Sequence, residues 1–576
     1  MAEAQGKRLD SWKEIAAYLG RDVTTVRRWE KLESLPVRRH RHAKLGSVYA
    51  HSTELDAWRA ERASGAPAGG APAPQATPQG PRARSVLALA VLAVALIGLL
   101  AWFLRAERAQ VKSGSEGARV QSLAVLPLVN FSGDPAQDFL ADGMTEALIA
   151  RLSLIRGIRV ISRTSVMQFK GTREPLSEIA KRLKVDAVLE GSVQRSGDRL
   201  RVNVQLIRGA SDEHLWSTTL DRELRDVLTL QSEIAQGIAR HIEATFTDLE
   251  ADRLVAARSV SPDVYESYLR GRFALHKRSR TELVEAIKLF EDAIDRDPSF
   301  AAAYAGLAAA HDAMGSVFFG AAPGEARAKV MASVQKALEL DPELVEARVL
   351  HAGVLQKDWR WAEAEAEYQR VLEVNPSDSA AHVGYARWLL CQGRTREALA
   401  WAERGRALDP LALIGMDIGW ILFQDRRYDE AIRELRGVLS VEPESLRARW
   451  LLAFSLIASA QLDEAIATLE RLAPDSNRSP AVLGLLVRAY AHAGRRRDAL
   501  RVLDEMHRKR RKGYVPAAAF LNAYLGLGDT ERAFDWLDRA AQERSNIVQF
   551  LRTHPYFDPL RSDPRFAGYL RRANLQ

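Results

Sequence analysis

The side chains best placed to do chemistry in this chain are cations near its N-terminus. Between Arg21 and Lys44 lie eight Lys or Arg residues against three carboxylates, which accounts for five of the eight excess positive charges of the 576-residue chain. Clustered cations neutralise phosphates, and neighbouring hydroxyl groups can add hydrogen bonds to DNA. The predicted DNA-binding residues are Thr24, Thr25, Arg27, Arg28, Lys31, Arg38, Arg39, Arg41 and Lys44.

Motifs for other chemistries are absent from the sequence. It contains no Walker loop, no GxGxxG, no HExxH and no GxSxG. Four carboxylates of the middle region stand at no catalytic spacing, and we interpret them as solvated or helix-capping: Asp138, Asp142, Asp186 and Glu190. The single cysteine, Cys391, has no partner His or Asp at nucleophile or metal spacing, which indicates a core position. We therefore predict no catalytic residue, no enzymatic activity, no metal and no cofactor.

Two short predicted helices carry the first group of cations. Ser11 and Glu14 form a capping box before an apolar stripe, and Gly20 ends the first helix. Asp22 caps the second helix, whose apolar residues Val23, Val26 and Trp29 share one face. The opposite face is cationic and hydroxylated. A glycine turn between two such helices is typical of the helix-turn-helix, in which the second helix enters the major groove.

The second group of cations follows Pro36 in the stretch VRRHRHAKLGSVYAH. Two short extended runs around residues 44–46 predict a hairpin wing whose cations reach phosphates or a minor groove. Three histidines, His40, His42 and His51, lack a Cys or acidic ligand that would complete a metal site. Ser52 caps a third helix that contains Leu55 and Trp58.

The stretches EIAAYLG and TVRRWE resemble the winged helix-turn-helix of the excisionase and mercury-regulator-like families. The resemblance covers residues 9–62, and we assign residues 1–62 to this domain. It implies that Thr25, Arg27 and Arg28 face DNA. A solvated basic surface on a small helical domain is the alternative.

Residues 85–104, SVLALAVLAVALIGLLAWFL, are twenty uncharged residues between two arginines. As a helix they would extend roughly 30 Å, the thickness of a bilayer's hydrocarbon core, and they predict one transmembrane helix. Residues 63–84 before it are rich in Pro, Gly and Ala and predict a flexible linker, and residues 105–119 predict a juxtamembrane linker.

The charges that flank this segment are balanced, so the positive-inside rule does not orient it. Because a DNA-binding domain must share a compartment with DNA, we expect a cytoplasmic N-terminus, a bacterial inner-membrane location, and a C-terminal part outside the cytoplasm.

Strand and helix signals alternate over residues 120–249. Strands are predicted at 122–129, 158–162, 187–193, 200–206 and 214–220. Two stretches of this region are similar to the TolB-N-like domain of bacterial signalling proteins: AVLPLVNFSGDPAQDFLADGMTEALIARLS and VDAVLEGSVQRSGDRLRVNVQLI. The resemblance implies an α/β domain beside helical repeats.

Residues 262–545 contain a repeat. Alanines recur at intervals of 34, 33, 34, 34 and 34 residues, at Ala364, Ala398, Ala431, Ala465, Ala499 and Ala533. This is the tetratricopeptide period, and it predicts an all-α superhelix of about eight units followed by a capping tail at 546–576. Superhelices of this type bind peptide or protein segments. Four tryptophans are either groove anchors or core residues: Trp359, Trp361, Trp388 and Trp401.

Together these features predict a multidomain, single-pass membrane transcriptional regulator. Its architecture resembles the CadC-like and ToxR-like regulators, with promoter DNA, a peptide or protein ligand of the repeats and a second copy of the chain as partners. A membrane-tethered interaction scaffold and an enzyme with an unrecognised site are the alternatives.

Overall fold

The computed structural model describes residues 7–32, 34–39, 48–63, 120–155, 157–242, 259–277, 279–316, 318 and 322–576. The chain divides into two compact units, Met1–Glu116 and Gly117–Gln576. Each unit is described by itself.

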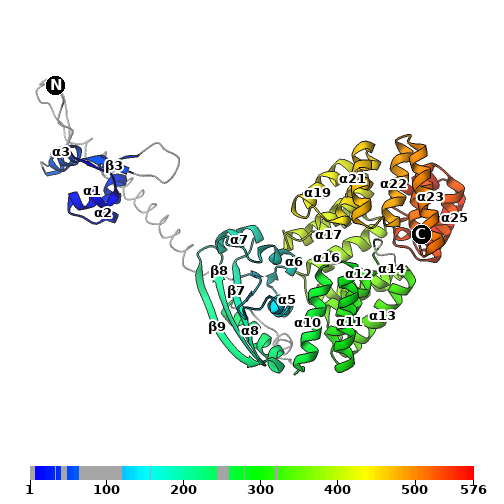
Figure 1. Cartoon of the computed structure of the whole chain (residues 1–576), viewed down its shortest axis with the longest axis horizontal. Coiled ribbons are helices and arrows are strands. Elements are labelled where there is room, and N and C mark those ends of the chain that lie inside the picture. The colour runs from blue at the N-terminus through cyan, green and yellow to red at the C-terminus, as the bar shows by residue number, and fades with distance from the viewer. Residues whose placement is uncertain are drawn as a thin grey trace, which may run out of the picture. The chain divides into compact units, whose positions relative to one another are not determined.

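The N-terminal unit combines three helices with a small antiparallel sheet (Figure 1). The helices are α1 (Trp12–Leu19), α2 (Val23–Leu32) and α3 (Ser52–Ala63), and the strands β1 (Arg8–Leu9), β2 (Arg38–Arg39) and β3 (Val48–His51) pair in the order β1-β3-β2. The predicted caps are present. The Ser11 side chain accepts a hydrogen bond from the Glu14 backbone N–H, and Gly20 ends α1 at φ 65°, a left-handed conformation that favours glycine.

The helices of this unit enclose a small core. Ile15, Val26 and Leu55, one from each helix, have no exposed surface. Trp29 of α2 packs against Trp58 of α3 with ring centroids 5.5 Å apart. Because Val26 and Trp29 pack one face of α2 into this core, the opposite face of the helix points toward solvent.

The predicted membrane segment, residues 85–104, lies outside the described residues, as do residues 64–84 and 105–119. In the parts of the chain that the structure describes, no helix has the length and apolar character needed to cross a bilayer. The described residues thus give the predicted inner-membrane location no support, and we do not retain it.

The middle region, residues 120–242, is a mixed sheet with helices packed on it. Strands β4 (Ser122–Val125), β6 (Arg159–Val160), β7 (Ala187–Ser196), β8 (Arg199–Arg208) and β9 (Glu213–Glu223) run in the order β6-β4-β7-β8-β9, and β5 (Val129–Asn130) pairs with β7. β4 is parallel to β6 and β7, whereas β7, β8 and β9 form antiparallel pairs. The helices are α5 (Asp138–Leu152), α6 (Arg163–Val166), α7 (Leu176–Leu183) and α8 (Val227–His241), with 3-10 turns η1 (Pro135–Gln137), η2 (Met167–Phe169) and η3 (Leu224–Asp226).

One strand of this region differs from its prediction. The sequence predicted a single strand over residues 122–129, but the structure contains β4 and β5 separated by Pro127. Proline has no backbone N–H to donate to the ladder, so the regular pairing ends there. The alternation predicted for β8 is confirmed, because Leu200, Val202, Val204 and Leu206 are all fully buried.

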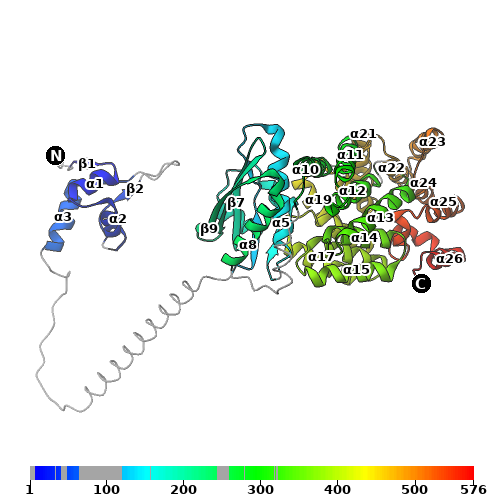
Figure 2. The ribbon, with the colours of Figure 1, turned by 90° about the horizontal axis from the view of Figure 1, so that it is seen from below.

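The C-terminal region contains eight antiparallel helix pairs within the described residues (Figure 2). The first helices of the pairs are α10 (Pro262–Lys277), α12 (Ala301–Met314), α14 (Val345–Lys357), α16 (Ser379–Cys391), α18 (Gly415–Gln424), α20 (Leu446–Ala458), α22 (Pro480–His492) and α24 (Ala517–Leu527). The second helices are α11 (Arg280–Arg296), α13 (Pro323–Leu340), α15 (Trp361–Val374), α17 (Thr395–Leu408), α19 (Tyr428–Val441), α21 (Leu462–Asp475), α23 (Arg496–Lys512) and α25 (Thr530–Gln542).

The recurring alanines lie on six successive second helices, and all six are fully buried. A methyl group there allows the two helices of a pair to pack closely. The tryptophans are mainly core residues, since Trp359, Trp361 and Trp388 are less than 10% exposed. Cys391 is fully buried, as predicted, and burial raises the pKa of its thiol.

The chain ends in two 3-10 turns and a helix, η4 (Asn546–Phe550), η5 (Pro555–Leu560) and α26 (Pro564–Arg572). This tail packs on the last helix pair, as a cap would: Arg565 forms an ion pair with Glu531, and Tyr569 stacks on Phe534. It also extends back along the first helices as far as α14.

A buried group of charges joins the middle region to the repeats. Arg272 of α10 is 9% exposed and contacts the carboxylates of Glu146 on α5 and Glu346 on α14. His276 and Arg163 lie 3.2 and 3.6 Å from the Glu146 carboxylate. Burial alone would raise the pKa of Glu146, but Arg272, the hydrogen bond to His276 and Arg163 outweigh it and hold this pKa well below its ordinary range.

Glu146→Gln should therefore lower the free energy of unfolding by about 3 kcal/mol, because it leaves Arg272 and Arg163 buried beside an uncharged group. Glu282→Gln, which removes the exposed pair with Lys277, is the matched control and should cost less than about 1 kcal/mol. Urea unfolding followed by circular dichroism measures both. Equal losses of unfolding free energy in the two variants would show that the buried charges stabilise the fold no more than an exposed ion pair does.

The same carboxyl predicts a pH dependence. Because its pKa is lowered in the folded state, its stabilisation is complete above the ordinary value of about 4.5 and is lost as the pH falls toward the folded pKa. The stability difference between the wild type and Glu146→Gln should shrink as the pH falls below about 4.5. A difference that stays constant from pH 6 to pH 3 would contradict the assignment.

In the N-terminal unit, Trp29→Ala should lower the free energy of unfolding by roughly 3 kcal/mol, since it removes the ring that packs on Trp58. Arg28→Ala, on the exposed face of the same helix, should change it by less than about 0.5 kcal/mol. Chemical denaturation of residues 1–63 followed by circular dichroism tests this pair. Similar losses in both variants would mean that the exposed face is also part of the core.

Candidate functional site

The exposed face of α2 is the candidate interface. Thr24, Arg27, Arg28 and Lys31 are all exposed, and spacings of three and four residues place them on one side of the helix. Within the described residues, Arg28 and Lys31 form no ion pair with a carboxylate. This face therefore offers free cations to an anionic partner.

Thr25 lies at the start of α2, where it contacts the capping residue of the helix. Its side chain is half-buried, and its hydroxyl group donates a 2.6 Å hydrogen bond to the Asp22 carboxylate. The same carboxylate accepts the backbone N–H of Thr25 at 2.8 Å and thereby caps α2. The Thr25 hydroxyl and then this N–H lower the pKa of Asp22. In this structure Thr25 stabilises the start of the helix.

Two other predicted cations, Arg27 and Arg38, have partners within the N-terminal unit. The Arg27 guanidinium lies 5.4 Å from the centre of the Trp12 ring, which ties it to the start of α1. Arg38 of β2 forms a 2.5 Å ion pair with Glu54 of α3, a partner that sequence reasoning missed. The Arg39 side chain, Arg41 and Lys44 lie outside the described residues. Among the predicted cations whose side chains the structure describes, those of α2 lie together on one surface.

The carboxylates of the middle region have structural partners. Asp142 is 4% exposed, so it is not solvated, and it lies 2.7 Å from the Lys170 ammonium. Asp138 lies 3.4 Å from the same ammonium and accepts from the Asn130 amide at 2.9 Å. Asp186 accepts from the Ser122 hydroxyl at 2.8 Å. In the described part of the chain, no group of three or more His, Cys, Asp or Glu residues is arranged to hold a metal ion.

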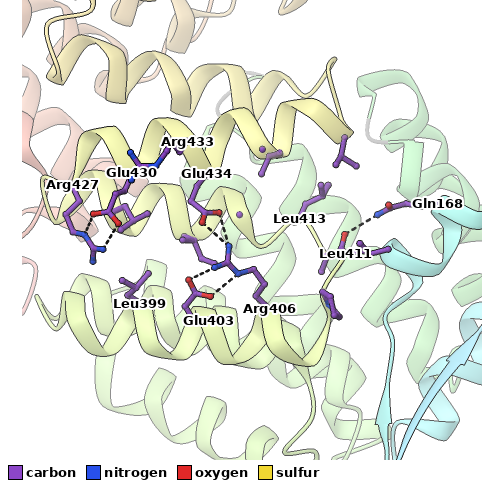
Figure 3. Close-up of a pocket in the computed structure, with 18 residues that line it drawn as sticks. Gln168, Leu399, Glu403, Arg406, Leu411, Leu413, Arg427, Glu430, Arg433 and Glu434 are labelled. Atoms are coloured by element: carbon purple, nitrogen blue, oxygen red, sulfur yellow. Dashed lines mark hydrogen bonds and ion pairs between the residues drawn. The ribbon is translucent and has the colours of Figure 1, made fainter. Parts of the chain in front are cut away.

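A pocket of about 480 Å³ lies between α17 and α19 (Figure 3). Its apolar part includes Leu399, Leu413 and Val438. Its charged groups neutralise one another: Arg406 pairs with Glu403 and Glu434, and Arg427 pairs with Glu430 (Figure 3). Sequence reasoning missed this pocket, because its lining comes from three helices and from Gln168 of the middle region, and no motif links them.

Comparison with known families finds three matches along the chain. Residues 119–237 match the model of the HilA/YgeH-like transcriptional regulator, second domain. Residues 354–412 and 422–489 match tetratricopeptide repeat models, so the predicted repeats are confirmed.

A curated relative from Rhizobium meliloti (strain 1021) bears the name "Putative adenylate cyclase 3". It is 37% identical over 186 residues, which are 32% of this chain and 32% of the relative. The chain thus spans about a third of the length of this relative. Because its name describes an enzyme, the match contradicts the prediction that the protein has no enzymatic activity, and we do not retain that prediction.

Solved structures with repeats of this kind are also similar. A thermophilic TPR protein of Thermus thermophilus is 17% identical, with a TM-score of 0.29, 34% of this chain covered and 99% of the other. A tetratricopeptide repeat protein of Parabacteroides merdae is 14% identical, with a TM-score of 0.32, 46% of this chain covered and 98% of the other. On the family matches alone, this chain combines a transcriptional-regulator-like domain with tetratricopeptide repeats.

Proposed function

We propose that the protein is a transcriptional regulator that binds promoter DNA through the exposed face of α2 and binds a peptide or protein partner through its repeats. The observation that carries the proposal is the set of four exposed polar side chains, Thr24, Arg27, Arg28 and Lys31, on one face of a helix whose back is packed in the core. The match of residues 119–237 to a domain of transcriptional regulators supports it.

In this proposal the N-terminal unit acts as a winged helix-turn-helix. α2 enters the major groove, where guanidinium groups donate hydrogen bonds to guanine edges and phosphates. The hairpin of β2 and β3 is the wing. Arg38 is held by Glu54, so it contributes to phosphate binding only after leaving that carboxylate. Thr24 and Lys31, at the two ends of the face, fix the position of the helix along the groove.

A homodimer would suit this function. Two copies held together present two DNA-binding units to paired half-sites. Because the second unit binds at a high effective concentration, the avidity of the pair can exceed the affinity of a single unit by roughly a hundredfold. Regulation through the repeats would then act by changing self-association.

A scaffold for protein–protein interaction is the second candidate function, because tetratricopeptide repeats occupy much of the chain. In that case the basic face of α2 would bind an acidic protein surface. DNA binding by residues 1–63 separates the two candidates.

The decisive experiment uses residues 1–63 and a duplex selected from a random-sequence library. Arg27→Ala combined with Arg28→Ala should weaken binding about 100-fold or more, since each guanidinium contact with DNA contributes about 1–3 kcal/mol. The pair should also reduce the salt dependence of the affinity, by up to about 2 in the slope of log K against log salt. Gel shift at several salt concentrations measures both effects.

The control removes the same charge from the other two helices. Lys13→Ala with Arg59→Ala takes away two exposed cations of α1 and α3, and it should weaken binding less than about fivefold. Equal losses in the two double variants would mean that binding follows net charge and not the α2 face. If the selection yields no duplex, DNA binding is contradicted and the scaffold is favoured.

A further inference from the structure

The inner face of the repeat superhelix is formed by the first helices of the pairs. From α14 to α24, successive first helices contact one another, whereas successive second helices are farther apart. The shorter circumference of a curved stack is its inner side, so the first helices line the concave face. This is the surface to which the proposed function assigns a peptide or protein partner.

The tail of the chain covers this face. Starting from α14, the Gln356 amide donates to Gln549 at 3.1 Å, and Arg552 donates to the Gln392 carbonyl just after α16 at 2.9 Å. Thr553 then donates to Gln424 at the end of α18. One short segment, residues 549–553, thus reaches three successive units.

The tail continues across the later units. The Tyr556 hydroxyl donates to the Phe454 carbonyl of α20 at 3.0 Å, and its ring lies 3.3 Å from the Arg488 guanidinium of α22. Asp558 pairs with Arg426 at 2.8 Å. η5 also contacts α24. Together these contacts cover all six first helices from α14 to α24.

The anchor of the tail is His554, which has no exposed surface. Its ring lies 5.4 Å from the rings of Trp420 and Phe423 and 5.7 Å from that of Phe454. Burial, and then the charge of Arg488, lowers the pKa of this histidine, so the ring inserts in its neutral form. His554 thus lies against residues of α18 and α20 from a segment that forms no helix pair of its own, so it resembles a residue of a bound peptide more than part of a ninth repeat.

The face that the tail contacts carries buried polar residues. Gln356 near the end of α14 and Gln424 at the end of α18 are 7% and 1% exposed. Arg488 is 5% exposed, and its Nε and one terminal nitrogen have no hydrogen-bond partner within the described residues. Repeats packed as a permanent core would favour apolar residues at such positions, since a buried unpaired donor costs free energy. A binding groove requires polar ones.

We propose that residues 546–576 are an intramolecular ligand of the concave face, so that an external partner reaches this face only by displacing them. The inference deepens the partner-binding part of the proposed function and rests on it. Tethering gives the segment an effective concentration in the millimolar range, which excludes competitors present at micromolar concentration.

The test uses the full chain and a labelled synthetic peptide of residues 545–576. Substituting the tail alone, with Thr553→Ala, Tyr556→Ala and Asp558→Lys, weakens the tethered ligand and leaves the groove unchanged. Fluorescence anisotropy should show one peptide bound per chain in this variant, with an affinity at least tenfold higher than in the wild type. Arg571→Ala, an exposed tail residue without a groove contact, is the control and should bind as weakly as the wild type.

Two results would overturn the proposal: equal binding of the peptide to the wild type and the triple variant, or no binding to either. A peptide with His554, Tyr556 and Phe557 replaced by serine must also fail to bind.

Hydrogen exchange of the wild type gives an answer even if the triple variant does not fold. Amides of residues 546–576 should exchange together through an opening that leaves α20 and α22 protected. Exchange of the tail only with global unfolding would show that it is part of one cooperative core, and would overturn the proposal. Neither measurement involves DNA, so failure here is distinct from failure of the proposed DNA binding.

Discussion

The close contact between paired helices at one small residue is the constraint on which the C-terminal region depends. Each of the six recurring alanines is fully buried on a second helix, and a larger side chain would force that helix away from its neighbours. Repetition of this contact every 33 or 34 residues gives successive units the same geometry. The units therefore stack into a curved array with the first helices inside, and the inner face becomes a continuous groove.

Polar contacts also join this array to the middle region and join its last helix pair to an earlier one. The buried charges around Arg272 attach the middle region to α10 and α14, and Asp409, between α17 and α18, accepts hydrogen bonds from Ser162 and Ser165 of that region. At the other end, Arg544 donates to the Asp358 carbonyl, 186 residues earlier in the chain. Buried polar contacts therefore join the middle region to the repeats at more than one point.

The charges of the N-terminal unit differ from the buried, paired charges of the C-terminal unit. Its core is small, and its exposed face consists of cations without carboxylate partners among the described residues. Such a face has little to contribute to folding, since exposed charges stabilise a fold only weakly. Its value in the proposed function lies in binding a polyanion, where each released counterion contributes to affinity.

The sequence by itself determined the local features: the capping box at Ser11, the glycine turn at Gly20, the strand alternation in β8 and the repeat period. These depend on residues close together in the chain. Only the tertiary structure decided that Arg38 is paired with Glu54, that Asp142 is buried beside Lys170, and that the tail lies along the inner face instead of only capping the last unit. Each of these contacts joins residues 16 to nearly 200 positions apart, and no periodicity or motif encodes such pairings. They follow from how the elements pack.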